Sequence, residues 1–274
     1  MDRWKRLQSI DNRVIYWVVF IAIAIPLLRP LGIPLTVGDT TKMQHNLIEI
    51  LKKGDVVLMS LDYTALVAPE VHPSAEALCR HLFGKGVKVV FWGYIQEGPM
   101  FGEKLIRDLG SQYNLVYGTD VINLGYVPGG ASGVRAFGDN LLGSAPRDFR
   151  NNTTANMPIM KDIRTAKDFK LVLGVGDGLE TMVQQIGAVH GAKVGGASTA
   201  AGVSGLLPYL NSKQLSGFLQ GLRGAAEYEI LISRPGSAVA KMDAQSIGHL
   251  VIIGFIVICN FAFFMQKKEK KAGT

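Results

Sequence analysis

Hydrophobic residues gather in two long runs near the ends of the chain, and a mixed pattern fills the middle. The first run covers residues 14–35 and the second covers residues 247–266. About 20 mainly apolar residues are needed for a helix to cross the hydrocarbon core of a bilayer. Both runs are therefore predicted to be transmembrane helices. Pro26 is expected to kink the first helix, and Arg29 is expected near its far interface.

A cleaved signal peptide is the alternative for the first run. Ala22-Ile23-Ala24 resembles the small-residue site at which such peptides are cut. The apolar run continues beyond this point and Pro26 follows almost at once, which favours an uncleaved anchor. Whether the segment is ever cleaved stays open.

Positive charges flank both apolar runs and predict the orientation of the chain. Four basic residues precede the first run within residues 1–13, and a lysine cluster follows the second run within residues 267–274. Basic residues next to a span stay on the cytoplasmic side. Both tails are therefore predicted to be cytoplasmic, and residues 36–245 are predicted to form a domain outside a plasma membrane, in the periplasm or extracellular space.

The net charge of +7 does not indicate a nucleic-acid-binding protein. Most of the excess charge lies in the two tails, while the middle of the chain is nearly neutral and carries no basic stripe, which a nucleic-acid interface requires. The lipid bilayer is thus an expected partner and nucleic acid is not. Cys79 falls in the middle domain and Cys259 in the second run, so no disulfide between them is predicted.

Short apolar runs alternate with helical periodicity in the middle of the chain. Strands are predicted at 55–61, 87–92, 120–124, 170–174, about 193–194 and 230–232, and helices at 41–53, 74–85, 99–112, 133–142, 179–190 and 212–224. This alternation predicts an α/β domain with a mostly parallel, doubly wound sheet of flavodoxin-like or Rossmann-like type. Residues 144–167 fit no element, and a loop of this length is often functional.

Glycine and acidic residues follow several of the predicted strands. In an open parallel sheet, ligands bind beyond the carboxyl ends of the strands. The candidate ligand-binding residues at this edge are Asp62, Gly129, Gly130, Gly174, Gly176, Asp177 and Gly178. Backbone N–H groups there would suit a phosphorylated or sugar-like ligand. A simple glycine turn, with Asp177 and Glu180 capping the next helix, explains the same residues. No cofactor is identified.

Acidic and imidazole groups also surround the predicted strand 55–61 and the helix 74–85 that follows it, at Asp62, Glu70, His72, Glu76 and His81. None has the spacing of a zinc motif, and Glu76 with Arg80 is an ordinary i,i+4 pair, so a solvated helix start is favoured and no metal site is predicted. No signature of a known catalytic site occurs in the chain, and this favours a protein that is not an enzyme.

Two groups of residues suggest helix interfaces. Gly217, Gly221 and Gly224 would form a small-residue face on the predicted helix 212–224, suited to close contact with a neighbouring helix. His249 and Asn260 are separated by about three helical turns and would share one face of the second span. Either group could also pack within the chain. The expected partners are a second copy of the chain or other membrane subunits.

The stretch Gly221-Leu-Arg-Gly-Ala-Ala-Glu-Tyr-Glu229, together with Met242-Asp-Ala-Gln-Ser before an apolar run, resembles uncharacterised two-pass prokaryotic membrane proteins. The resemblance covers about the last sixty residues. It implies a prokaryotic plasma membrane and no particular activity. The expected function is that of a structural or scaffolding subunit of a membrane assembly, and the alternative is a ligand-binding domain or enzyme that uses the glycine-rich sheet edge.

Overall fold

The computed structural model describes residues 11–272 and divides the chain into two compact units. One unit is the continuous segment Leu35–Ala238, called the α/β unit below. The other combines Met1–Pro34 with Val239–Thr274 and is called the helical unit. Residues 1–10 of the predicted cytoplasmic tail, and residues 273 and 274 of the lysine-rich tail, lie outside the described part.

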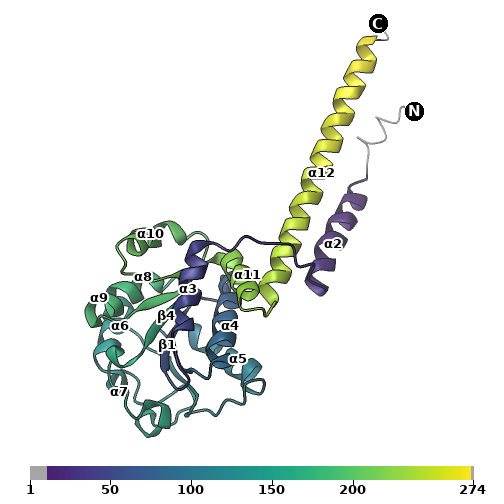
Figure 1. Ribbon diagram of the computed structural model, residues 1–274. Coiled ribbons are helices and arrows are strands. Elements are labelled where there is room, and N and C mark those ends of the chain that lie inside the picture. Colours follow the sequence, from purple (N-terminus) through teal and green to yellow (C-terminus); the bar gives the residue numbers. More distant parts are fainter. Residues whose placement is uncertain (1–10, 273–274) are drawn as a thin grey trace. The chain divides into compact units, whose positions relative to one another are not determined.

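A six-stranded, all-parallel sheet forms the centre of the α/β unit (Figure 1). Its strands are β1 (Val56–Asp62), β2 (Lys88–Gly93), β3 (Val121–Tyr126), β4 (Leu171–Gly176), β5 (Val194–Ser198) and β6 (Phe218–Gln220). They lie in the order β3-β2-β1-β4-β5-β6. This is the strand order of a Rossmann-like sheet. The predicted parallel α/β fold is therefore confirmed.

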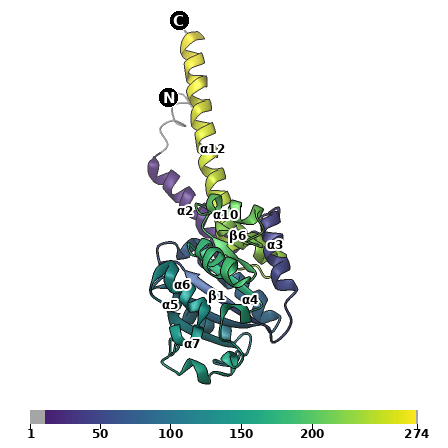
Figure 2. The same ribbon diagram turned by 90° about the vertical axis from the view of Figure 1, so that its left-hand side faces the viewer.

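Helices cover both faces of this sheet (Figure 2). One face packs against α3 (Asp39–Glu49), α4 (Ala68–Gly84), α5 (Gly98–Gly110) and α11 (Gly221–Leu231). The other packs against α6 (Gly130–Asp139), α7 (Leu141–Ser144), α8 (Leu179–Met182) and α10 (Val203–Asn211). Alternate residues of a strand point to opposite faces, so Val57 and Met59 join the first core and Leu58 the second.

The segment that matched no predicted element is an ordered covering of the second core. It forms three short 3₁₀ turns, Thr154–Asn156, Pro158–Met160 and Ala166–Asp168. Ile159, Met160 and Ile163 are buried there. Because the apolar residues sit in single turns, they produce no helical or strand period that a sequence pattern could reveal.

Two predicted elements are wrong. The expected helix 212–224 is interrupted by β6 and by Gly221, which starts α11 with a left-handed φ of +53°. The expected last strand at 230–232 belongs instead to the end of α11 and its cap at Ile232. Strand β6 is only three residues long, too short for its alternation to be recognised.

The helical unit contains α2 (Asn12–Leu28) and α12 (Ser237–Ala272). Within the described residues, only the stretch Ser237–Lys267 of α12 is long and apolar enough to be a candidate membrane span, and 18 successive residues within it have a mean hydropathy of 2.4. The predicted span 247–266 lies inside it. Helix α2 has 17 residues and falls short of the same criterion. Its predicted extension to residue 35 is wrong, because Arg29 adopts an extended conformation and Pro30 follows.

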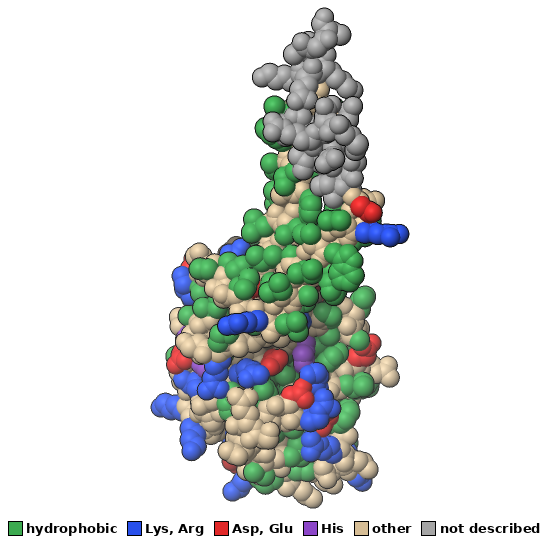
Figure 3. All heavy atoms as spheres, turned by 90° about the vertical axis from the view of Figure 1, so that its right-hand side faces the viewer, with side chains coloured by type: hydrophobic (Ala, Val, Ile, Leu, Met, Phe, Trp, Pro, Cys, Tyr) green, Lys and Arg blue, Asp and Glu red, His purple; other side chains and the backbone are tan. Residues whose placement is uncertain are grey.

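Apolar side chains dominate the surface of the helical unit, whereas charged side chains are scattered over the α/β unit (Figure 3). Within the helical unit, buried Asp243 accepts hydrogen bonds from the backbone N–H groups of Leu31, Gly32 and Ile33, at 2.7, 2.9 and 3.1 Å. These three N–H groups follow the end of α2 and have no helical hydrogen bonds. Asp243 supplies the acceptors that water would otherwise have to provide.

Candidate functional site

Strands β1 and β4 are neighbours at the centre of the sheet, and the strand order runs outwards from them in both directions. Such a topological switch point is where open α/β sheets bind ligands, beyond the carboxyl ends of the strands. Asp62 ends β1, and Gly174 to Gly178 end β4 and form the following turn. The structure thus brings five of the predicted ligand-binding residues together at this point.

Asp62 is completely buried and is bonded to its own chain. Its carboxyl group accepts a hydrogen bond from the Ser60 hydroxyl and a 2.9 Å bond from the backbone N–H of Tyr94. Burial disfavours the charged form and raises the pKa of Asp62 to about 7, although these hydrogen bonds act in the opposite direction. The carboxyl group therefore ties the end of β1 to the loop after β2.

The glycine turn after β4 closes directly over Asp62. Gly176 has a φ of +103°, and a Cβ atom there would lie 2.4 Å from the Asp62 carbonyl oxygen. A Cβ atom at Gly178 would lie 2.5 Å from Asp62 Oδ2. The N–H of Asp177 donates to the Asp62 carbonyl at 3.1 Å. These glycines are required by close packing of the chain on itself, which leaves the Asp62 side chain no contact with solvent.

Of the two roles that the sequence suggested for Asp177, the structure contradicts helix capping, and ligand binding stays a prediction. Its side chain is exposed, and α8 begins with Gly178 as a cap that makes no side-chain bond. The predicted capping by Asp177 is therefore wrong. Close by, the Tyr94 hydroxyl donates to Thr181 Oγ1 at 3.2 Å, and exposed Glu180 accepts from the Tyr209 hydroxyl at 2.9 Å. This part of the edge is polar and open to solvent.

Gly129 and Gly130 do not join the switch point. They begin α6 after β3, which is separated from β1 by β2. Gly129 has a φ of +105° and Gly130 a φ of +55°, and both are exposed. Glycine tolerates these conformations without steric cost, so a sharp strand-to-helix turn accounts for both.

The three glycines expected to form an interface do not share a helix face. Gly217 lies before β6, where a Cβ atom would be 2.5 Å from the backbone nitrogen of Gln44. A Cβ atom at Gly224, in α11, would be 2.9 Å from the Leu219 carbonyl carbon. Gly221 lies at the turn between β6 and α11. All three make close contacts within their own unit.

His249 and Asn260 are both exposed on α12. The Asn260 side-chain amide donates to the backbone carbonyl of Ile256 at 2.8 Å, one turn earlier in the same helix. This bond reduces the cost of placing an amide in an apolar environment. A role of this face in contact with another helix stays a prediction.

The acidic and imidazole groups around the predicted strand 55–61 and helix 74–85 are separated in the structure. Glu70 accepts from the Ala200 N–H at 2.6 Å, His72 bonds to the Tyr63 hydroxyl at 2.8 Å, and Glu76 pairs with Arg80 at 2.7 Å as expected. Only His81 belongs to a different and tighter group.

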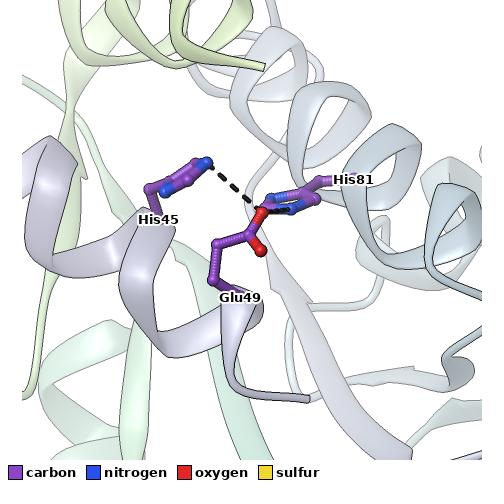
Figure 4. Close-up of side chains that lie close together, drawn as sticks. All are labelled: His45, Glu49 and His81. Carbon is purple, nitrogen blue, oxygen red and sulfur yellow. Dashed lines mark hydrogen bonds and ion pairs between the residues drawn. The ribbon is translucent and has the colours of Figure 1, made fainter. Parts of the chain in front are cut away.

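His45, Glu49 and His81 form a cluster at the last turns of α3 and α4, just before the chain enters β1 and β2 (Figure 4). Glu49 Oε1 lies 2.9 Å from His81 Nε2 and 3.5 Å from His45 Nε2. The two imidazole rings are stacked with their centroids 5.0 Å apart. The side chains point toward one another and their three ligand atoms lie within 4.8 Å of each other.

Neighbouring groups fix the charge and orientation of this cluster. The hydrogen bond from Lys85 lowers the pKa of Glu49, and burial lowers the pKa of His81. Lys85 Nζ lies 3.0 Å from Glu49 Oε2, and the hydroxyl of buried Tyr228 lies 2.6 Å from His81 Nδ1. The cluster therefore contains an ionised carboxylate and a His81 ring that is neutral at neutral pH, with its Nε2 directed at Glu49.

Sequence reasoning missed this cluster although part of its signal is present. His45 and Glu49 are four residues apart on a predicted helix and so share a face. The third residue comes from another helix, and no local spacing predicts which residue of α4 meets that face. His81 was instead grouped with residues nearer to it along the chain.

Comparison with models of known protein families gives no match, and no curated protein is significantly similar to this sequence.

Proposed function

We propose that this chain is a two-pass plasma-membrane protein that holds its Rossmann-like domain outside the cytoplasm, as a structural or scaffolding subunit of a membrane assembly. Both termini lie in the cytoplasm in this proposal. The partners are other membrane subunits or a second copy of the chain.

Membrane anchoring is supported first by α12, whose exposed side chains include Ile252, Val257 and Phe261. Water would not solvate such a surface favourably. Helix α2 is shorter, and its apolar part, residues 14–28, extends about 22 Å at 1.5 Å per residue. A hydrocarbon core of about 30 Å can thin locally to match it. The basic residues before α2 and after the apolar part of α12 support an orientation with both ends inside.

The closed switch point is the single observation that carries the structural role. The place where a Rossmann-like sheet takes its ligand is filled by the buried carboxyl of Asp62, with Gly176 and Gly178 packed over it. In this domain, side chains and backbone of the chain itself occupy the position where a Rossmann-like sheet usually binds its ligand. Such a domain is better suited to contacting partner proteins through its surface than to converting a substrate.

A polar ligand at the outer part of the same edge is the second candidate. Exposed Asp177 and Glu180, with the Tyr94–Thr181 pair beside them, provide hydrogen-bonding groups there. Such a ligand would bring hydroxyl or cationic groups, because the carboxylates would repel the phosphate considered from the sequence.

Purification from native membranes in mild detergent, followed by native mass spectrometry, tests the proposed role. We expect the chain in a complex, with further copies of itself or with another membrane protein in a fixed ratio. A strict monomer that retains no partner after crosslinking in the membrane would contradict the scaffolding role. A small molecule retained by the wild type and lost from Asp177→Asn would instead support the second candidate.

A further inference from the structure

We propose that His45, Glu49 and His81 bind a divalent transition-metal ion, with Zn²⁺ as the best fit. This site is separate from the sheet edge and goes beyond the structural role proposed above. Its parts come from two helices that pack on one face of the sheet, α3 and α4. The sequence alone predicted no metal here.

The spacing of the three ligand atoms fits tetrahedral zinc. Zinc binds imidazole nitrogen and carboxylate oxygen at about 2.0–2.1 Å, so two ligands of a tetrahedral site are separated by about 3.3 Å. Glu49 Oε1 lies 2.9 Å from His81 Nε2 and 3.5 Å from His45 Nε2. The first distance is slightly shorter than this ligand separation and the second slightly longer. The third separation is within 4.8 Å, and a small rotation of the partly exposed His45 ring would shorten it.

The two oxygens of Glu49 have different partners. Oε1 faces both imidazoles, whereas Oε2 is bonded to Lys85 at 3.0 Å. A metal ion on Oε1 can therefore leave the Lys85 pair in place. The positive charge of Lys85 repels a divalent cation at this position. The bonds from the two imidazole nitrogens to the ion must outweigh this repulsion.

The contact with Tyr228 provides the outer support that metal-binding histidines usually have. A ligand histidine commonly uses its second ring nitrogen for a hydrogen bond that fixes the ring. Here the Tyr228 hydroxyl lies 2.6 Å from His81 Nδ1, which leaves Nε2 for the ion. Two imidazoles with one carboxylate favour Zn²⁺ or a similar transition metal over Mg²⁺ or Ca²⁺, which prefer oxygen ligands.

The site is accessible from solvent. The Glu49 side chain is 46% exposed and that of His45 is 20% exposed. The three residues line a cavity of about 440 Å³ together with Arg80, Lys85 and Arg234. Three protein ligands beside such a cavity leave the fourth zinc position to water, the arrangement typical of zinc sites that are not purely structural.

Zinc binding to the full-length chain in detergent, without a polyhistidine tag and after treatment with a chelator, tests the proposal by isothermal titration calorimetry. We expect one Zn²⁺ per chain. His45→Gln and Glu49→Gln should each lower the affinity about tenfold or more, because each removes one of three ligands. His72→Gln is the matched control, since His72 belongs to the same unit but bonds to Tyr63.

Two further measurements keep the outcome decisive. Unchanged thermal unfolding of His45→Gln without metal would show that its loss of affinity is not a loss of fold. Co²⁺ in place of Zn²⁺ should give the intense visible absorption of tetrahedral coordination. The proposal is overturned if the wild type binds no stoichiometric zinc, if His45→Gln and His72→Gln bind it equally, or if Co²⁺ retains the weak spectrum of its hydrated ion.

Discussion

Two carboxyl groups in the α/β unit show how differently one fold can use an acid. Asp62 lies at the switch point, fully buried and covered by a glycine turn. Glu49 lies at the end of α3, 46% exposed, beside two imidazoles and a cavity. The first group holds together segments that are distant in sequence. The second has an oxygen in a position where an added ion can reach it.

The pKa values of the two carboxyl groups are shifted in opposite directions. Burial raises the pKa of Asp62 to about 7, while the hydrogen bond from Lys85 lowers the pKa of Glu49. A buried carboxyl without a cationic partner favours its neutral form, and an exposed one beside a lysine favours its charged form. The switch point is the position where this fold usually binds a ligand. It holds Asp62, whose buried carboxyl group is less suited to bind a ligand than that of Glu49.

Replacing the buried carboxyl gives the largest expected effect on stability. Asp62 is protonated in both states below its unfolded pKa of 3.8, and only the folded state retains the proton from there to about pH 7. The free energy of unfolding of the wild type should therefore fall as the pH rises through this window. Asp62→Asn, which cannot ionise, should lack the fall and exceed the wild type by about 4 kcal/mol above pH 7.

Urea unfolding of both proteins from pH 4 to pH 8 measures this difference. The amide can keep both contacts, since its oxygen can accept from Tyr94 N–H and its nitrogen can donate to Ser60. Asp177→Asn removes an exposed carboxylate from the next turn and should retain the wild-type profile. Parallel pH profiles for Asp62→Asn and the wild type would contradict the buried, mainly neutral Asp62.

Filling the glycine turn should have the next largest effect. Gly176→Ala combines a φ of +103° with a Cβ atom 2.4 Å from the Asp62 carbonyl oxygen. We expect it to lower the free energy of unfolding by roughly 3 kcal/mol. Gly205→Ala is the matched control, because nothing lies within 4 Å of its Cβ position in α10. It should stabilise the chain by about 0.5–1 kcal/mol through helix propensity. Equal effects would exclude close packing at the switch point.

Much of the fold could be predicted because the spacing of apolar residues along the chain follows the buried faces of its strands and helices. The apolar runs at β1, β2 and β4 are strand-length and lie between amphipathic helices, so the parallel sheet follows from their alternation. Strand β6 could not be found, since its three residues lie among Leu215, Phe218, Leu219 and Leu222, which also recur at helical spacing. The predicted end of α2 is too late because apolar residues resume after Arg29 and Pro30, where the helix stops.

The candidate sites were also predictable only where they depend on local sequence or on strand ends, and not where they depend on tertiary packing. Asp62 and the turn at Gly174 to Gly178 were correctly grouped, because strand ends of a parallel sheet meet at one edge. Their closure was not predictable, since it depends on distances of a few ångströms between β1 and β4. His45 and Glu49 share a helix face in the sequence, but their contact with His81 arises from the tertiary arrangement in which α3 and α4 both pack against α11.

Labelling of introduced cysteines in intact cells with a membrane-impermeant maleimide tests the proposed topology most directly. Native Cys79 is buried with a raised pKa, so the parent chain should give little background in the α/β unit. We expect Ser212→Cys, at an exposed position of this unit, to react in intact cells, and Ser9→Cys to react only after permeabilisation. Labelling of Ser9→Cys in intact cells, or protection of Ser212→Cys until the membrane is opened, would contradict a domain held outside by two crossings.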